Sequence, residues 1–174
     1  MNAVPGSAAK LDLDRLPPHV RAWVTADRNQ DLTVMKEQLS PSVVLISPLT
    51  DAFTFDGPDE VMAVFESAFE LLSDIEIAGV TCADQDWVIY GTNTIGGENL
   101  EEIQWLRLDD AGRIERITLF IRPAPAAITL LSRIGPRLKK RGVMGGAAAF
   151  ASGAARPLAL ALRVTEGRVM PRLR

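Results

Sequence analysis

Two polar side chains, Glu102 and Gln104, stand two positions apart at the start of a stretch that is rich in Ile and Leu and ends at Pro123. In a β-strand, residues two apart point to the same side of the sheet, so both side chains share a face. The same face of the predicted hairpin carries Leu106, Ile117, Leu119 and Ile121. A carboxyl group in apolar surroundings is desolvated, which raises its pKa and suits it to proton transfer near neutral pH. Glu102 is therefore the candidate general acid or base; the alternative is a position at the solvent end of the sheet.

The hairpin is predicted from two apolar runs, 103–108 and 113–121, on either side of a turn that ends in Gly112. Its opposite face carries Ile103, Trp105, Arg107, Thr118 and Phe120. Aromatic side chains on an exposed sheet face indicate an interface. Tyr90, on a predicted strand 87–94, is a further candidate, as a hydrogen-bond donor to a bound carbonyl or as a half-buried sheet residue.

The order of the other elements predicts an α+β fold. Val20, Trp23 and Val24 recur at helical spacing after Pro17-Pro18, and residues 32–39 and 58–72 continue with two more helical patterns. Strands are predicted at 43–46, 75–82, 87–94, 100–108 and 113–121. We expect about three N-terminal helices to pack on one face of a curved antiparallel sheet that forms a cone.

The chain divides into three parts by composition. Residues 1–16 are expected to be a loose leader, 17–123 the cone domain, and 124–174 a basic, Ala- and Gly-rich extension that is helical or loosely ordered. Gly135-Pro136 is expected to kink or end the first helix of this extension.

The formal net charge of −3 hides two oppositely charged parts. Residues 1–132 hold 9 Lys and Arg against 21 Asp and Glu, whereas residues 133–174 hold 10 Lys and Arg against Glu166. The basic extension is expected either to fold back over the acidic body as a lid or to lie on an anionic membrane surface. Nucleic acid is not an expected partner, because Phe150 is the only aromatic residue of the extension and the body repels phosphate.

Cellular location is predicted from two further observations. The longest low-charge stretch, 142–155, is too short to cross a bilayer, and the single cysteine, Cys82, fits a reducing compartment. The predicted location is cytoplasmic, peripheral to a membrane if the extension binds one. No cofactor is expected, and no metal site, because His19 and Cys82 are the only residues of their types.

Several segments together resemble the nuclear transport factor two-like superfamily, and in particular its uncharacterised bacterial SnoaL-like members with a cystatin-like cone fold. They are the first helix with Trp23 and Asp31, then Val43–Pro48, Phe55–Gly57 and Leu106–Pro123. The resemblance implies a cone of sheet around an apolar pocket capped by the helices. Ketosteroid isomerases, epoxide hydrolases, polyketide cyclases and ligand-binding proteins share this fold, so the fold does not choose among them.

The resemblance also implies where catalytic groups would stand. The tyrosine position of ketosteroid isomerases falls on Trp23, the catalytic-base position on Ser47 and the strand aspartate on Gln104. A serine without a basic partner is a poor proton shuttle, so the usual base is missing. The Asp–Arg–Asp set of limonene-type epoxide hydrolases is also missing, since strand 87–94 has no Arg or Asp and the second Asp position falls on Leu119.

Three functions remain open, and whether the protein is an enzyme is undecided. The first is binding of a small apolar molecule of steroid, terpenoid, polyketide or acyl type, without the family's usual catalytic set. Trp23, Ser47, Tyr90 and Gln104 would then orient its polar end, and Leu106, Ile117 and Leu119 would line the wall. The second is an isomerase, cyclase or hydrolase with Glu102 as acid or base, and the third is a dimeric interaction module.

The aromatic outer face of the hairpin predicts a homodimer, because relatives commonly pair through this face. Sedimentation equilibrium at micromolar concentration is expected to give twice the mass of one chain. A single-chain mass at that concentration would contradict the prediction.

Overall fold

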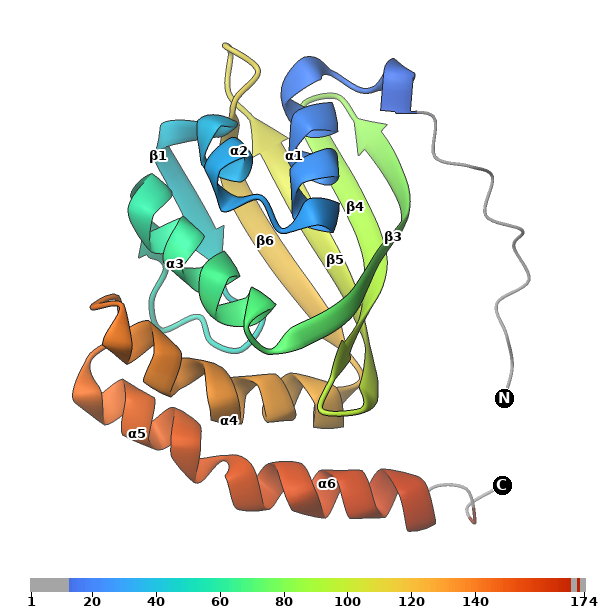
Figure 1. The fold of residues 1–174 in the computed structure, drawn as a ribbon, viewed down its shortest axis with the longest axis vertical. Coiled ribbons are helices and arrows are strands. Elements are labelled where there is room, and N and C mark those ends of the chain that lie inside the picture. The colour runs from blue at the N-terminus through green and yellow to red at the C-terminus, as the bar shows by residue number, and fades with distance from the viewer. Residues whose placement is uncertain (1–12, 170–171, 173–174) are drawn as a thin grey trace.

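The computed structural model describes residues 13–169 and residue 172. Its central element is a curved six-stranded sheet, on which the helices pack. Its strands are β1 (Leu39–Ile46), β2 (Phe55–Asp56), β3 (Leu72–Ala83), β4 (Asp86–Ile95), β5 (Glu98–Leu108) and β6 (Ile114–Arg122). Their order in the sheet is β2-β1-β6-β5-β4-β3 (Figure 1). The predicted α+β class is confirmed.

Strands β3 to β6 form the predicted antiparallel meander. The prediction of a purely antiparallel sheet is wrong at one pair, since β1 lies parallel to β6. The reason is topological: the chain leaves β1, builds a helix and the whole meander, and returns beside β1 in the same direction. Strand propensity identifies strands but not their partners.

The sheet bends most strongly along β3. The pairing of β3 with β4 changes register between Ser73 and Glu76 and again between Ile77 and Gly79, as β-bulges do. At Gly91 on β4, a Cβ atom would lie 2.3 Å from the Glu76 carbonyl oxygen, so only glycine permits this close approach. These irregularities turn a flat meander into a concave surface.

Three helices lie over the concave face: α1 (Pro18–Asn29), α2 (Leu32–Glu37) and α3 (Gly57–Phe69). Proline opens both α1 and α3, where no backbone N–H is needed for the helix ladder. Asp31 caps α2 by accepting a hydrogen bond from the Val34 N–H at 3.1 Å. Ahead of α1, Leu13–Arg15 is a 3-10 turn, and the remaining expected leader, 1–12, lies outside the described residues.

The extension forms three helices, α4 (Ala124–Lys140), α5 (Gly146–Ala154) and α6 (Arg156–Arg168). In Figure 1, α4 crosses below α3 and the sheet, and α5 and α6 form an outer layer against it. Of the two expected effects of Gly135-Pro136, a kink or an end of the first helix, the end is wrong, because α4 continues through Pro136 to Lys140. Gly135 serves packing instead: a Cβ there would lie 2.4 Å from the Ser152 side chain of α5.

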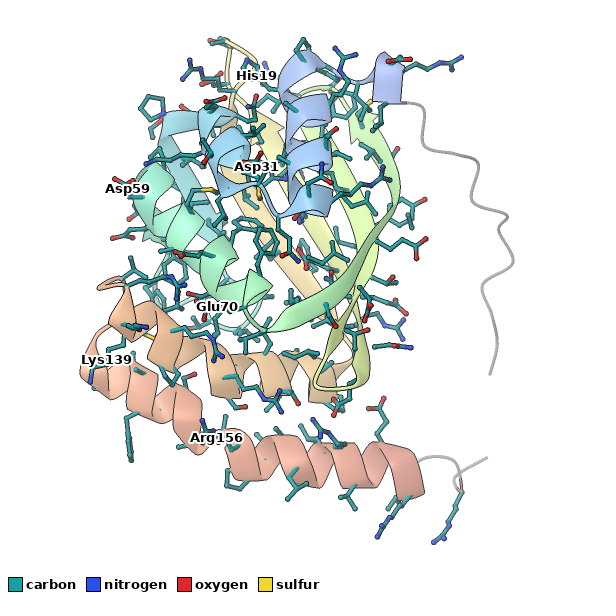
Figure 2. The ribbon with its side chains drawn as sticks, viewed as in Figure 1. His19, Asp31, Asp59, Glu70, Lys139 and Arg156 are labelled. Atoms are coloured by element: carbon teal, nitrogen blue, oxygen red, sulfur yellow. The ribbon has the colours of Figure 1, made fainter. Side chains whose placement is uncertain are left out.

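Ion pairs join the basic extension to the acidic body. Arg141 contacts both Glu66 and Glu70 of the α3 end, and Arg137 Nε donates to Glu70 Oε2 at 2.9 Å. Glu70 lies where α3 comes nearest to α4 (Figure 2). The extension thus folds back over the body. Its contact with a membrane surface stays a prediction.

A search of the described helices finds none that is both long and apolar enough to cross a membrane.

The core under the helices sets the stability of the cone. Ile117 is fully buried on the concave side of β6, whereas its neighbour Thr118 faces the other side. Ile117→Ala is expected to lower the free energy of unfolding by about 2–5 kcal/mol, because it removes buried methyl groups and leaves a cavity. Urea unfolding measures this change. Thr118→Ala is the matched control on the same strand, and equal losses in the two variants would contradict the assignment of faces.

Candidate active site

A cavity of about 100 Å³ lies between the concave sheet, α3 and α4. Most of its wall is apolar, and its polar side chains gather on α1, β4 and β5 as Asp27, Asn93, Glu102 and Gln104. Leu130, Leu131, Ile134 and Leu138 of α4 line it from the opposite end. The cavity is therefore apolar toward the extension and acidic toward the first helix.

Two carboxyl groups meet at the acidic end through one amide. Gln104 Nε2 donates to Asp27 Oδ2 and to Glu102 Oε1, both at 3.0 Å. Asn93 Nδ2 donates to the other Glu102 oxygen, also at 3.0 Å. Glu102 thus accepts two hydrogen bonds, whereas among the described residues only Gln104 donates to the Asp27 side chain.

Trp23 determines which way the Gln104 amide points. Its indole Nε1 donates to Gln104 Oε1 at 2.8 Å, and an indole can only donate. The amide oxygen therefore faces Trp23, and both amide hydrogens face the carboxyl groups. Trp23 is fully buried behind Gln104 and does not line the cavity.

Local structure brings these residues together. On α1, Val20, Trp23, Val24 and Asp27 follow one helical face that packs on the sheet, so Asp27 is buried with them. On β5, alternation turns Glu102 and Gln104 to the concave side. Gln104 pairs with Ile89 and Glu102 with Gly91, beside Asn93 on β4.

The structure places four of the predicted site residues in the cavity wall: Ser47, Glu102, Gln104 and Leu119. Their roles in binding or catalysis stay predictions. Ser47 Oγ accepts a hydrogen bond from the Leu49 N–H at 3.1 Å, which leaves its hydroxyl hydrogen available to a ligand.

The other four predicted site residues lie outside the cavity wall. Tyr90 lies on the outer face of the sheet, 47% exposed, where its ring crosses Gly79 of β3. Trp23 touches Gln104 rather than the cavity. Leu106 and Ile117 face the correct side but lie deeper, fully buried in the core under the helices.

Asp27 and Asn93 are the site residues that the sequence analysis missed. Asp27 does carry a signal, because it stands at helical spacing on the apolar face of the first helix. Asn93 carries a weaker one, two residues from Gly91 on a strand with no clear alternation.

Comparison with known families now decides the relationship. The profile of the SnoaL-like domain matches residues 20–117, more than half of the chain. The chain belongs to the SnoaL-like domain family. By sequence, no curated protein matches it.

Solved structures share the fold of this SnoaL-like domain at low sequence identity. A steroid delta-isomerase from Pseudomonas aeruginosa is 22% identical, with a TM-score of 0.65 over 70% of this chain and 90% of that one. An uncharacterised protein with a cystatin-like fold from Silicibacter pomeroyi is 18% identical, with a TM-score of 0.65 over 69% and 84%. A protein with a ketosteroid isomerase-like fold from Catenulispora acidiphila, in complex with trimethylamine, is 12% identical, with a TM-score of 0.51 over 68% and 93%.

Burial changes the acidity of both carboxyl groups in this SnoaL-like domain. Burial first, and then the charge of Glu102, raises the pKa of Asp27 to about 7, while the hydrogen bond from Gln104 and the charge of Arg28 oppose the rise. Burial also raises the pKa of Glu102, against the hydrogen bonds from Gln104 and Asn93. Asp27 can therefore gain or lose a proton near neutral pH, which a catalytic acid or base requires.

A buried carboxyl with a raised pKa makes folding depend on pH. The folded protein holds the Asp27 proton more tightly than the unfolded chain, so this stability is present at low pH and is lost as pH rises through about 7. Between pH 5 and pH 8 the free energy of unfolding of the native protein is expected to fall by about 2–3 kcal/mol more than that of Asp27→Asn, in which residue 27 cannot ionise. Urea unfolding at both pH values measures it. The exposed control Asp51→Asn should keep the native slope, and an Asp27→Asn protein with the native slope would refute the assignment.

Proposed function

We propose that this SnoaL-like domain is a proton-transfer enzyme of isomerase type that acts on a small, mainly apolar carbonyl compound. The observation that supports this proposal is the buried carboxyl group of Asp27 and the half-buried carboxyl group of Glu102, joined by Gln104 at the end of an apolar cavity. Buried carboxyl groups are costly, and a site that only held an apolar molecule would gain nothing from them.

The proposed step needs only residues of this chain. The Asp27 carboxylate takes a proton from carbon next to the substrate carbonyl; the electron pair of the broken C–H bond forms a C=C bond, and the π pair of the carbonyl moves to its oxygen. Ser47 is the candidate donor to that oxygen, since it lines the cavity with a free hydroxyl hydrogen. Return of the proton to a different carbon of the conjugated system completes the isomerisation. Glu102 keeps the pKa of Asp27 high through its charge.

The volume of the cavity limits the size of the substrate. At about 100 Å³ it is smaller than a cavity of about 150 Å³ that holds benzene. A short acyl compound therefore fits it best, a single-ring compound requires the side chains of the wall to shift, and a steroid would need α4 to move.

A second candidate is binding of a small organic cation without catalysis. No Lys, Arg or His is among the described residues that line the cavity, so Arg28 acts on the charge of Asp27 only from outside the cavity wall. The complex of the Catenulispora acidiphila protein with trimethylamine supports a ligand of this size and charge. Apolar walls and two carboxyl groups would suit such a trialkylammonium ion.

We also propose that two copies pair through the outer sheet face. Tyr90, Ile103 and Phe120 are exposed there side by side on β4, β5 and β6, where Tyr90 pairs with Ile103 and Ile103 with Phe120. An apolar and aromatic patch of this kind is typical of an interface.

Cyclohex-3-enone is a suitable first probe for the enzyme, because it is among the smallest cyclic β,γ-enones and its isomerisation to the conjugated enone changes ultraviolet absorbance. The native protein is expected to catalyse this conversion and, in D₂O, to exchange the hydrogens next to the carbonyl. Asp27→Asn is expected to lower the rate about 10²–10⁴-fold, because it removes the base.

Glu101→Gln is the matched control, since Glu101 precedes Glu102 but is exposed and pairs with Arg122. It should retain the native rate, whereas Glu102→Gln should shift the pH optimum down by lowering the pKa of Asp27. Absence of both isomerisation and exchange with small enones would reject the enzyme. Calorimetric binding of trimethylamine that is lost in Asp27→Asn would then favour the cation binder.

A further inference from the structure

The outer surface of α5 and α6 is unusually apolar for a solvent-facing layer. Phe150 is 80% exposed, Leu160 61% and Leu158 51%, and Val164 and Val169 are also exposed. Both helices pack on α4 and on each other, and they form the layer farthest from the sheet (Figure 1). Exposed apolar side chains gathered on one layer indicate a binding surface.

Basic residues border this apolar surface in a regular pattern. Arg156, Leu160, Val164 and Arg168 follow one another at intervals of four along α6, so they form one stripe with an arginine at each end. All four are exposed. Lys139 and Arg156 lie in the α4–α6 layer in Figure 2. Among the described residues, no acidic side chain pairs with Arg156, Arg168 or Lys139.

A basic groove adjoins the stripe. Arg133, Arg137, Arg156 and Arg163 line it between α4 and α6, together with Leu160. Glu70 neutralises Arg137 and Glu98 neutralises Arg163, whereas Arg133 and Arg156 have no carboxylate partner among the described residues. The groove therefore keeps a net positive charge, and Arg156 and Leu160 belong to both the groove and the stripe.

We propose that the α5–α6 surface docks the protein on an anionic phospholipid membrane, with lipid phosphate groups in the arginine groove. Apolar side chains enter the boundary between head groups and acyl chains, while guanidinium groups pair with phosphate. A soluble anion would use the groove but would leave Phe150 and Leu160 in water.

The charge distribution gives the docking one orientation. Residues 1–132 carry a formal charge of −12 and residues 133–174 a charge of +9. An anionic surface attracts the helical layer and repels the cone, so only this layer turns toward the membrane. A second copy of the chain is the other possible occupant, since its cone is acidic, but a contact between copies would not need lipid.

Co-sedimentation with lipid vesicles tests the proposal on the full chain. We expect binding at low salt to phosphatidylcholine vesicles that contain one-third phosphatidylglycerol, little binding to pure phosphatidylcholine, and release at high salt. Arg156→Gln is expected to weaken binding about fivefold, the usual effect of one basic residue near an anionic surface. Arg113→Gln is the matched control, because Arg113 is exposed in the turn between β5 and β6. It should bind as the native chain does.

Leu160→Ser separates the apolar contribution from charge. It is expected to weaken vesicle binding several-fold at every salt concentration, and circular dichroism should show an unchanged fold because the side chain is exposed. No binding to the anionic vesicles at low salt overturns the proposal. Binding of inorganic phosphate without vesicle binding also overturns it, because that result would mean a site for a soluble anion. A dimer mass in the absence of lipid that Leu160→Ser abolishes overturns it as well, because the surface would then bind a second copy.

Discussion

The hydrogen bond from the Trp23 indole to Gln104 is the constraint on which the site depends. The indole N–H can donate a hydrogen bond but cannot accept one, so the Gln104 amide must turn its oxygen toward Trp23. In that orientation both amide hydrogens point at carboxyl groups. If the amide turned over, its oxygen would face two acidic side chains inside an apolar cone. The position of α1 on the sheet, set by Val20, Trp23 and Val24, therefore also places Asp27 beside Gln104.

Two buried carboxyl groups cost free energy that the rest of the cone must offset. Hydrogen bonds from Gln104 and Asn93 recover part of it, and a raised pKa lets Asp27 avoid a full charge below neutral pH. The remaining stability comes from the apolar core and from closure by α4. One side of α4 completes the cavity wall with Leu130 and Ile134, and the other side holds α5 and α6. A change on the outer layer can thus reach the cavity through one helix.

The sequence predicted well on which face of the sheet a β5 or β6 side chain lies, but not whether that side chain lines the cavity or lies in the core. Alternation in 100–108 is regular, so it correctly placed Glu102 and Gln104 on the concave side. The same rule put Leu106 and Ile117 on that face, but alternation cannot tell cavity wall from core, because both are apolar. Strand 87–94 has apolar residues at consecutive positions, so its phase was undetermined and Tyr90 was assigned to the wrong side. The parallel β1–β6 pair and the continuous α4 depend on tertiary packing, which local propensity does not record.

Asp27 carried a sequence signal for the site that the pattern of apolar residues alone does not record. An aspartate at the fourth position of a buried helical stripe is costly unless it meets a donor or keeps its proton. That cost alone predicts either a buried partner or a raised pKa, and Asp27 has both. The identity of the partner was beyond sequence reasoning, because Gln104 is 77 residues away and reaches Asp27 only when the first helix lies across the fifth strand. Asp27 stands at none of the positions that the family resemblance marks, so the cost of burying it is the signal that identifies it.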